Sequence, residues 1–581
     1  MTVFADFRSV VLDALAQLQA EGRVPSGLDT AAVAMETPRD PAHGDLATNA
    51  ALVLARPAKL APRALAEALA EKLRAHPQVR SAEPAGPGFL NLRVDEAVWR
   101  AELREAIDLG AGWGRSEIGA GKSVDIEFVS ANPTGPLHVG HMRGAVFGDA
   151  LANLLQAAGW EVTREYYIND AGGQVDTLAR SAYLRYLEAH DRSIEIPEGL
   201  YPGEYLRDVG AALRAQFGDR FVDQPEEAWL EPIRDFAVAR MMDEIREDLA
   251  ALNIHMDLYS SEKAIAQSGA VEQAIGRLEE MGLIYRGVLE PPKGKLPEDW
   301  EPREQTLFRS TAYGDDVDRP IRKSGGSWTY FAPDIAYHYD KTQRGYDLLV
   351  DVLGADHGGY VKRLKAAVAA LTEGRVPLEA RLCQMVNLFK NGQPYKMSKR
   401  SGNFVTLRDV IDEVGPDVAR FVMLMRKNDA QLDFDFDKAL EQSRDNPVWY
   451  VQYAHARTAS LARQAQEAGF LLDDAGLATA DADLLDHPSE MALIRKIAEF
   501  PRHVEGGAQA QEPHRIAFYL YDLAGVFHAL WSRGKEEEEL RFVQASDPEG
   551  TRARLALVRA TQLTLANGMR ILGVTPMDEM R

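Results

Sequence analysis

The chain has 581 residues, of which 46% are hydrophobic and 27% are charged, and its formal net charge at pH 7 is −22. This length predicts several domains with ample core, and the composition is ordinary for a globular protein. The sequence contains no apolar stretch of about 18 residues, which excludes a membrane-spanning helix, and its single cysteine, Cys383, excludes an internal disulfide and a cysteine-rich zinc site.

The first 18 residues carry Asp6 and Asp13 among their apolar residues and do not resemble a signal peptide. Together with the lone cysteine, this predicts a cytoplasmic protein without a membrane anchor. The net charge argues against nucleic-acid binding, which needs a basic surface. Net charge is a sum, however, whereas a nucleic-acid footprint is local, so the composition leaves an RNA partner open.

Residues 1–110 read as a small α+β module. Helical periodicity covers Phe4–Glu21 and Pro62–Ala75, and Pro62 suits a first helical turn because its missing N–H has no partner to lose there. A Gly-Pro-Gly turn at 86–88 then leads into an apolar strand at 89–92.

Residues 111–410 alternate between strands, glycine-containing turns and helices. A helix is predicted from about Leu137 to Ala158, and a long insertion is predicted at about 185–325. Three segments read as strands: Val124–Val129, Glu161–Ile168 and Leu348–Leu353. This alternation predicts a parallel nucleotide-binding sheet of the Rossmann type.

Residues 411–581 show helical periodicity almost throughout. The predicted helices include Pro447–Ala465, Ala492–Val504, Pro513–Trp531 and Arg552–Leu572. The fold class predicted for the chain is therefore multidomain α/β, with a small α+β domain before the parallel sheet and an all-α domain after it.

The motif His138-Val139-Gly140-His141 lies at a predicted strand-to-helix turn. Backbone N–H groups and the helix dipole favour anions there, and histidine N–H groups can donate to phosphate oxygens. Gly144 follows Gly140 at i+4 spacing, which leaves one helix face open to a close approach or to tight helix packing. The histidines could instead be surface residues or metal ligands, although no cysteine cluster supplies the rest of a zinc site.

The second motif, Lys396-Met397-Ser398-Lys399-Arg400, follows the mostly apolar run Val386–Phe389. An ordinary basic loop is one interpretation. The other is a mobile cationic loop that closes on a triphosphate, where the loss of one well-placed donor costs roughly 3–4 kcal/mol of transition-state stabilisation. In this order, the two motifs indicate an enzyme that activates a carboxylate with ATP.

The two motifs resemble the ATP-binding motifs of class I aminoacyl-tRNA synthetases. The segments 126–135 and 164–172 narrow the resemblance to arginyl-tRNA synthetases. Segments 43–49 and 85–89 resemble the N-terminal module of that family, and segments 417–420 and 446–457 resemble its helical anticodon-binding domain. Lys399 is present here, whereas many arginyl enzymes lack that lysine.

The resemblance implies a role for each domain. The module at 1–110 would contact the tRNA elbow, the domain at 111–410 would be catalytic, and the helical domain at 411–581 would bind the anticodon loop. The aromatic residues Trp449, Tyr450 and Tyr453 are then candidates for stacking on unpaired bases, although at helical spacing a place in the core is at least as good an interpretation.

The resemblance also assigns site residues. His138, His141, Lys396 and Lys399 would be catalytic. ATP would be bound by His138, Val139, Gly140, His141, Gly144, Lys396, Met397, Ser398 and Lys399. Arginine would be bound by Glu127, Ser130, Asn132, Tyr330, Asp334 and Asp356. The planar guanidinium has five donors, and a carboxylate accepts two of them in parallel. A capping Asp334 beside a packed Tyr330 is the alternative.

The reaction implied by the resemblance has two steps. The arginine carboxylate attacks the α-phosphate of ATP, and the arginyl-adenylate then passes arginine to the 2′-OH of the terminal adenosine of tRNA(Arg). Mg²⁺ would accompany ATP on phosphate and water ligands, and no metal ligand is assigned to the protein. The partners would be tRNA(Arg), L-arginine and ATP, with the chain a monomer.

Three rival hypotheses remain at this point. A synthetase-like protein could bind tRNA without doing chemistry, although both motifs are intact. Another adenylyl or nucleotidyl transferase could share the sheet but would have no use for the terminal domains. A synthetase for glutamate, cysteine or lysine is the third. Glu127 and Asp334 would repel glutamate, and no cysteine-histidine zinc set exists to select a thiol.

Overall fold

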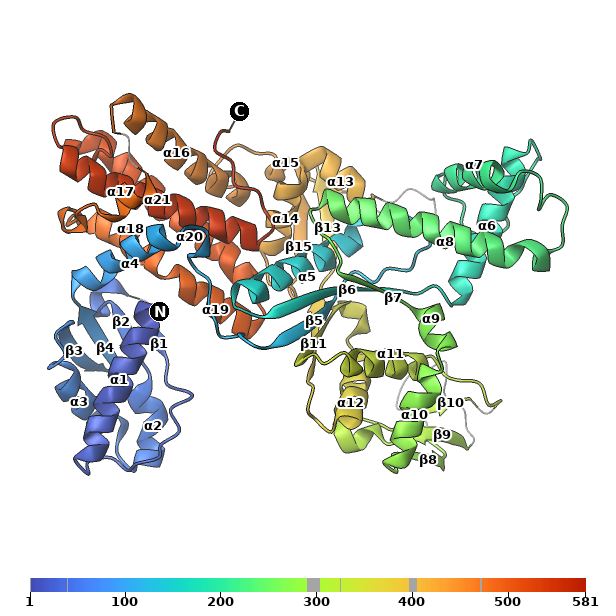
Figure 1. The fold of residues 1–581 in the computed structure, drawn as a ribbon, viewed down its shortest axis with the longest axis horizontal. Coiled ribbons are helices and arrows are strands. Elements are labelled where there is room, and N and C mark those ends of the chain that lie inside the picture. The colour runs from blue at the N-terminus through green and yellow to red at the C-terminus, as the bar shows by residue number, and fades with distance from the viewer. Residues whose placement is uncertain are drawn as a thin grey trace.

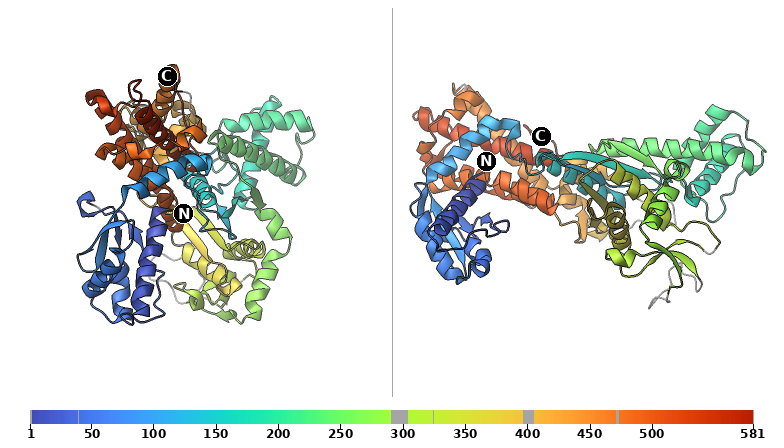
Figure 2. Two further views of the ribbon diagram at one scale, coloured as in Figure 1. Left: turned by 60° about the vertical axis from the view of Figure 1, so that its left-hand side comes forward. Right: turned by 60° about the horizontal axis from the view of Figure 1, so that its bottom comes forward.

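The structure is a computed structural model of the chain and describes residues 2–580, apart from 39, 290–303, 324, 396–404 and 471–472. Its centre is a parallel sheet (Figure 1). The N-terminal module and the helical domain lie toward one end of this sheet, and a set of long insertion helices extends from the other (Figure 2).

The N-terminal module is an antiparallel sheet of order β1-β2-β4-β3 packed against helices. Thr2 caps α1 by accepting a hydrogen bond from the Ala5 N–H, and Pro62 begins α3 as predicted. Its strands are β1 (Met35–Glu36), β2 (Leu46–Thr48), β3 (Val79–Ala85) and β4 (Phe89–Val94), and its helices are α1 (Val3–Ala20), α2 (Ala50–Ala58) and α3 (Pro62–Leu73). Helix α4 (Glu96–Leu109) then leads into the helical domain, where it packs on α18 and α21.

Glu102 on α4 is a buried carboxyl group, and burial raises its pKa from 4.5 to about 8. The folded chain therefore holds this group protonated at neutral pH, and its contribution to stability is lost as the pH rises from about 4.5 to about 8. We expect Glu102→Gln, which mimics the protonated form, to raise the free energy of unfolding of this module by about 2–3 kcal/mol at pH 7. Thermal unfolding at pH 5 and pH 7 measures the effect, and an equal gain at both pH values would contradict it.

The central sheet has the order β12-β11-β5-β6-β7, and all its strands are parallel. Its strands are β5 (Ser123–Glu127), β6 (Glu161–Ile168), β7 (Leu258–Ser261), β11 (Leu348–Gly354) and β12 (Leu378–Cys383). Helix α5 (Val139–Ala157) joins β5 to β6, whereas the later strands β11 and β12 lie on the other side of β5. The strand order therefore reverses between β5 and β11, and ligands of such sheets bind at the carboxyl ends of the strands at that point.

The region predicted as one insertion at about 185–325 consists of two excursions, because β7 returns to the central sheet between them. The four residues of β7 are too short for a recognisable sequence pattern. The first excursion holds α6 (Gly173–Ala189), α7 (Tyr205–Phe217) and α8 (Glu226–Ala251). The second holds α9 (Glu262–Gln267), α10 (Ala270–Glu280) and an antiparallel sheet of β8 (Ile284–Gly287), β9 (Gln305–Phe308) and β10 (Arg319–Arg322). Helices α11 (Phe331–Gln343) and α12 (Val361–Thr372) flank β11 in the chain.

After the central sheet, β13 (Val386–Lys390) pairs with β14 (Gln393–Pro394) and with β15 (Leu432–Asp435). The remaining helices are α13 (Leu407–Val414), α14 (Pro416–Leu424), α15 (Phe436–Ala439), α16 (Pro447–Glu467), α17 (Asp474–Ala478), α18 (Pro488–Ala498), α19 (Phe500–Ala510), α20 (His514–Glu536) and α21 (Pro548–Ile571). The single helix predicted over 492–504 is divided at Glu499. Pro501 starts a new helix there, because it has no N–H to continue the previous one.

A buried arginine on α14 ties the helical domain to the central sheet. The Arg420 guanidinium donates to an Asp149 carboxylate oxygen on α5 at 2.5 Å, to the Leu572 carbonyl at the end of α21 at 2.9 Å, and to the Leu252 carbonyl after α8 at 2.8 Å. Arg420 is fully buried. One side chain therefore joins three parts of the fold that are far apart in the sequence.

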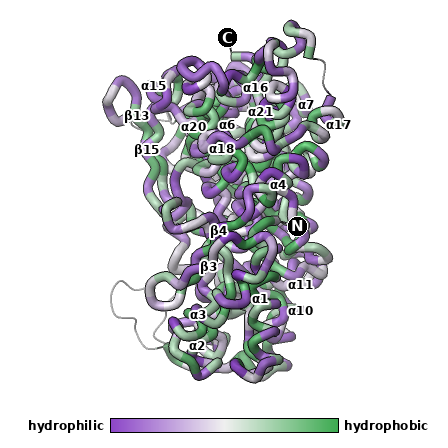
Figure 3. Tube along the Cα trace, turned by 90° about the vertical axis from the view of Figure 1, so that its left-hand side faces the viewer, coloured by the Kyte–Doolittle hydropathy of each residue, from purple (hydrophilic) through white to green (hydrophobic). Residues whose placement is uncertain are grey.

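Within the described residues, no helix is long and apolar enough to cross a membrane. Along the helices labelled in Figure 3, hydrophilic and hydrophobic residues are interspersed.

Candidate active site

The turn after β5 has an unusual backbone. Val129 and Ser130 have φ values of +69° and +39°, and a positive φ is a conformational outlier for a β-branched residue such as valine. The Ser130 hydroxyl holds this turn, since it donates to Glu127 Oε1 at 2.9 Å and accepts from the Tyr167 N–H at 3.1 Å. Strain of this kind costs about 1–3 kcal/mol per residue and is concentrated at functional sites.

Helix α5 begins within the first sequence motif. The Nδ1 atom of His138 accepts from the Gly140 N–H at 3.1 Å, and the Nδ1 atom of His141 accepts from the His138 N–H at 3.3 Å. The two rings stack with their centroids 3.8 Å apart. Because Nδ1 accepts in both rings, a neutral histidine carries its proton on Nε2 and donates from that atom. The predicted phosphate donors therefore sit at the positive end of a helix dipole.

The second motif, 396–400, lies outside the described residues, so Lys396, Met397, Ser398 and Lys399 remain sequence predictions. The chain is described again from Val405, whose carbonyl accepts from the Val139 N–H at 3.2 Å. Leu407 donates its N–H to the Leu137 carbonyl at 2.8 Å. The segment that follows the second motif thus runs alongside the first one.

A cavity of about 670 Å³ opens at this end of α5. Its lining includes His138, Gly140 and His141 of the first motif and Asn132 of the preceding loop. Ligand pockets commonly have volumes of about 300–1,000 Å³, so a nucleotide fits here by size. Gly144 lies one helical turn further along α5, with open space where a Cβ would be.

Two residues of the first excursion, one on α6 and one on α7, hold the loop that lines this cavity. The Asn132 side-chain amide donates to Gln174 Oε1 at 2.8 Å, and the Tyr205 hydroxyl donates to the Thr134 carbonyl at 2.6 Å. Neither Gln174 nor Tyr205 is predicted from the sequence. No motif marks either residue, and only the fold brings them to the loop.

Glu127 ends β5 and is only 8% exposed. Its Oε2 accepts from the Tyr337 hydroxyl at 2.7 Å and from Lys341 Nζ at 2.5 Å. Lys341 is fully buried, and it also lies 3.3 Å from Asp351. The charge of this predicted arginine ligand is therefore already paired within the protein.

Asp334 lies in the first turn of α11, where burial raises its pKa from 3.8 to about 6, while a hydrogen bond from the Tyr360 hydroxyl opposes the shift. Tyr330 stands one turn earlier, with 81% of its surface exposed. The alternative interpretation of these two residues does not hold, because Asp334 is not the helix cap and Tyr330 is not packed. Asp356, in the turn after β11, is exposed beside His357.

Tyr167 is half-buried, and the charges of four carboxyl groups act on it. Burial is the main cause that raises the pKa of this tyrosine, and the charges of Glu262, Asp334, Glu127 and Asp170 add to it. The pKa of Glu262 is also raised, first by burial and then by Asp334 and Asp170. Glu262, which begins α9 in the second excursion, is not predicted from the sequence. Such crowding of carboxyl groups creates a negative potential that suits a cationic ligand.

Side chains of α11 also reach a row of acidic residues on neighbouring strands of the sheet. The row includes Glu127 on β5, Glu165 on β6 and Asp351 on β11. The Asp351 carboxylate is bridged to His338 Nε2 at 2.9 Å and is held ionised by the charges of Lys341 and His338, which lower its pKa. Asp125 lies 3.7 Å from the Arg344 guanidinium, and burial raises its pKa to about 9 against the charge of Lys341. Among the described residues, no group of three or more histidine, cysteine or acidic side chains could hold a metal ion.

Comparison with known proteins decides the family. The chain is 64% identical over 581 residues to the arginine–tRNA ligase of Ruegeria pomeroyi, with 100% of both chains covered, and 63% identical to that of Paracoccus denitrificans with the same coverage. The chain belongs to the arginyl-tRNA synthetase family. Family descriptions match in three segments: the arginyl tRNA synthetase N terminal domain over residues 5–94, the class I (R) catalytic domain over 111–198, and the DALR anticodon binding domain over 451–580.

Solved structures agree with this membership. A putative arginyl-tRNA synthetase from Campylobacter jejuni has a TM-score of 0.72 and 32% identity, covering 84% of this chain and 100% of its own. The Thermus thermophilus arginyl-tRNA synthetase has a TM-score of 0.74 at 23% identity and covers 99% of this chain, which supports the fold. The family and the fold class predicted from the sequence are confirmed. The individual arginyl-tRNA synthetase site residues stay predictions.

Proposed function

We propose that the chain activates L-arginine with ATP and transfers it to the 2′-OH of the terminal adenosine of tRNA(Arg). The observation that carries the assignment is the carboxyl edge of β5, where His138 and His141 at the start of α5 line one cavity and the charges of four carboxyl groups act on Tyr167. The first group of residues suits a triphosphate and the second suits a guanidinium. Charging of tRNA(Arg) transcripts with labelled arginine tests the proposal, and no charged product from folded protein would contradict it.

In the first step, an arginine carboxylate oxygen attacks the α-phosphorus of ATP and pyrophosphate leaves. His138 and His141 donate to phosphate oxygens, and Lys396 and Lys399 neutralise the charge that builds on the leaving group. Mg²⁺ travels with ATP, held by phosphates and water. In the second step, the ribose 2′-OH attacks the arginyl carbonyl and AMP leaves. Most of the acceleration comes from positioning, which can contribute about 7–11 kcal/mol.

Asp334 is the best candidate for the direct guanidinium acceptor. Glu127 is already paired with Lys341, so its role is to shape the site and to hold Ser130 rather than to supply an unpaired charge. A buried carboxyl group whose pKa is raised gains most from a cation that arrives with its own donors. Lysine lacks the planar fork and would leave acceptors unsatisfied, which is how such a site rejects it.

The pH dependence of arginine use tests the role of Asp334. Arginine stays cationic at all pH values of interest, so only the ionised form of Asp334, present above about pH 6, binds it well. We expect kcat/KM for arginine to fall about tenfold per pH unit below that value. Asp334→Asn should remove this acid limb and lower kcat/KM at pH 8 by roughly 100-fold.

The matched control for this profile is Asp316→Asn, which removes an exposed carboxylate paired with Lys362. It should keep the acid limb of the wild type. The same acid limb in Asp334→Asn as in the wild type would exclude Asp334 as the titrating group.

The helical domain offers an aromatic face for unpaired bases. Trp449, Tyr450 and Tyr453 are partly exposed on α16, although Tyr450 also packs against the hydrophobic core, and Trp449 stacks on Tyr453 with centroids 4.6 Å apart. The Arg457 guanidinium lies over the Tyr453 ring at 4.3 Å and over the Trp531 ring at 3.7 Å. Stacked aromatic and guanidinium planes bind unpaired bases. This face is the proposed contact with the anticodon loop of tRNA(Arg). We propose further that the protein works as a monomer in the cytoplasm.

Replacing Tyr453 tests this face. Loss of one stacking contact costs about 1–3 kcal/mol, so we expect Tyr453→Ala to raise KM for tRNA between about 5-fold and 100-fold. KM for arginine and for ATP should not change, because these sites lie on another domain. Tyr453→Phe keeps the ring and should behave like the wild type. Equal KM values for tRNA in wild type and Tyr453→Ala would contradict the assignment.

A further inference from the structure

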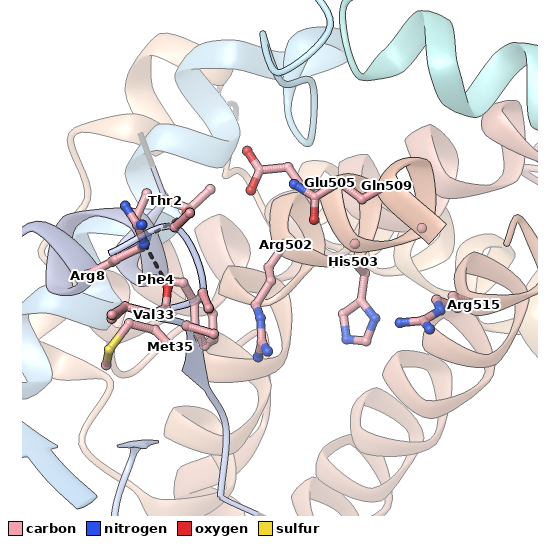
Figure 4. A pocket seen from close by; sticks show the side chains of 16 residues that line it. Thr2, Phe4, Arg8, Val33, Met35, Arg502, His503, Glu505, Gln509 and Arg515 are labelled. Carbon is pink, nitrogen blue, oxygen red and sulfur yellow. Dashed lines mark hydrogen bonds between the residues drawn. The ribbon is translucent and has the colours of Figure 1, made fainter. Parts of the chain in front are cut away.

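A cleft of about 590 Å³ lies where the N-terminal module meets the helical domain, and it shares no lining residue with the candidate active site. One wall is formed by the start of α1 and by segment 31–35. The other wall is formed by α19 and by Arg515 near the start of α20. Figure 4 shows Arg8 on the first wall and Arg502, His503 and Arg515 on the second.

Two of these arginines carry charges that no described carboxylate neutralises through an ion pair. Arg8 donates only to backbone carbonyls, those of Val33 at 2.8 Å and Thr30 at 2.9 Å. The Arg502 guanidinium lies over the Phe4 ring at 4.7 Å. Burial is the main cause that lowers its pKa, and the charges of Glu36 and Glu499 oppose this shift without an ion pair to Arg502 among the described residues. Positive charge is therefore held, partly desolvated, between two domains.

The other charged groups of the cleft leave this excess in place. The single acid in the lining, Glu505, accepts a hydrogen bond from the Ser116 hydroxyl at 2.7 Å. Arg515 is paired with Glu512, but it keeps half of its side chain exposed. Open space lies where a Cβ on Gly506 would be, so a ligand can approach the α19 backbone there.

We propose that this cleft binds the sugar–phosphate backbone of tRNA. A guanidinium matches a phosphate with two parallel hydrogen bonds, and it keeps its charge when partly buried. The chain as a whole carries a charge of −22, so RNA must be held by local positive clusters. The two walls belong to the segments that match the synthetase N-terminal and anticodon binding domains. An RNA that touches both domains must pass the junction between them.

This inference rests on the proposed function, and the test separates the two. Binding of tRNA(Arg) to the full chain is measured at several salt concentrations for the wild type and for the double variant Arg502→Gln/Arg515→Gln. We expect the dissociation constant at low salt to rise at least about tenfold, and the slope of log K against log salt to fall by about 1.5–2 because two phosphate contacts are lost. KM for arginine should stay unchanged.

Two further variants give the measurement its controls. Arg541→Gln/Arg552→Gln removes the same charge from exposed helical-domain residues that are paired with Glu538 and Glu549, and it should leave the salt slope unchanged. Arg502→Lys/Arg515→Lys keeps the charge and should restore the slope. A loosened domain interface would instead weaken binding equally at all salt concentrations.

A wild-type slope in the Gln double variant, or an equal fall in the Arg541/Arg552 control, would overturn the proposal. The same conclusion follows if the double variant changes the binding of inorganic phosphate but not of tRNA. Failure of the wild-type chain to charge tRNA(Arg) would instead count against the proposed function, whatever the cleft variants do.

Discussion

Lys341→Met should destabilise the central domain by about 3–5 kcal/mol, because it leaves buried carboxylates without their cation. Lys341 Nζ lies 2.5 Å from Glu127, 3.3 Å from Asp351 and 3.8 Å from Glu165, and all four side chains are buried. These acids come from three neighbouring strands, so one cation links the row, while Arg344 also pairs with Glu165 and His338 also pairs with Asp351. The free energy of unfolding, measured with denaturant at pH 7.5, gives the size of the effect.

The same substitution should alter arginine binding. Glu127 holds the Ser130 hydroxyl, and Ser130 holds the strained turn after β5. With Lys341 gone, the buried Glu127 carboxylate loses its cation and moves toward water, and KM for arginine rises. The double variant Lys341→Met/Glu127→Gln should recover part of the lost stability but not the activity.

Lys365→Met, at an exposed pair with Glu379, should change stability by less than about 1 kcal/mol. A similarly small change for Lys341→Met would contradict the account of this network.

Arg420→Met is the second substitution with a large expected effect. It removes a fully buried guanidinium from the carbonyls of Leu252 and Leu572 and from Asp149, which keeps its hydrogen bonds from Arg164 and Asn153. The loss of one partner from such a buried group costs about 3–5 kcal/mol. We expect the helical domain to unfold separately from the central domain, as two transitions in differential scanning calorimetry.

Two companion variants make this result specific. Arg426 is exposed just after α14, and the variant Arg426→Met should retain the wild-type unfolding profile. Gly573→Ala should behave like Arg420→Met, because Gly573 has a φ of +69° and an added Cβ would come within 2.0 Å of the Arg420 guanidinium. An unchanged profile for Arg420→Met would mean that the domains are held together by other contacts.

Much of the fold could be predicted from local sequence signals. Strand Glu161–Ile168 and the start of α3 at Pro62 agree with the structure to the residue, because alternating apolar residues and a helix-starting proline are local features. The first motif was placed correctly at the start of α5 for the same reason. The strain at Val129 could not be predicted, since nothing about a valine in an apolar run indicates a positive φ.

The contacts that give the site its charge could not be read from the sequence. Lys341 lies 214 positions from Glu127, and Glu262 reaches Tyr167 only because β7 returns to the sheet. The sequence also could not locate a basic surface within a chain of net charge −22. Arg8 and Arg502, nearly 500 residues apart, come together only when the N-terminal module packs on the helical domain. Pairings of this range depend on topology, which local patterns do not encode.

The most direct test of the central claim is ATP–pyrophosphate exchange, run with each of the twenty amino acids, with and without tRNA(Arg). We expect exchange with arginine and with no other amino acid, and we expect the rate of exchange to be highest when tRNA is present. Exchange with a different amino acid would contradict the assignment of the carboxyl cluster around Tyr167. No exchange under any condition, from folded protein that still binds tRNA, would contradict the catalytic function itself.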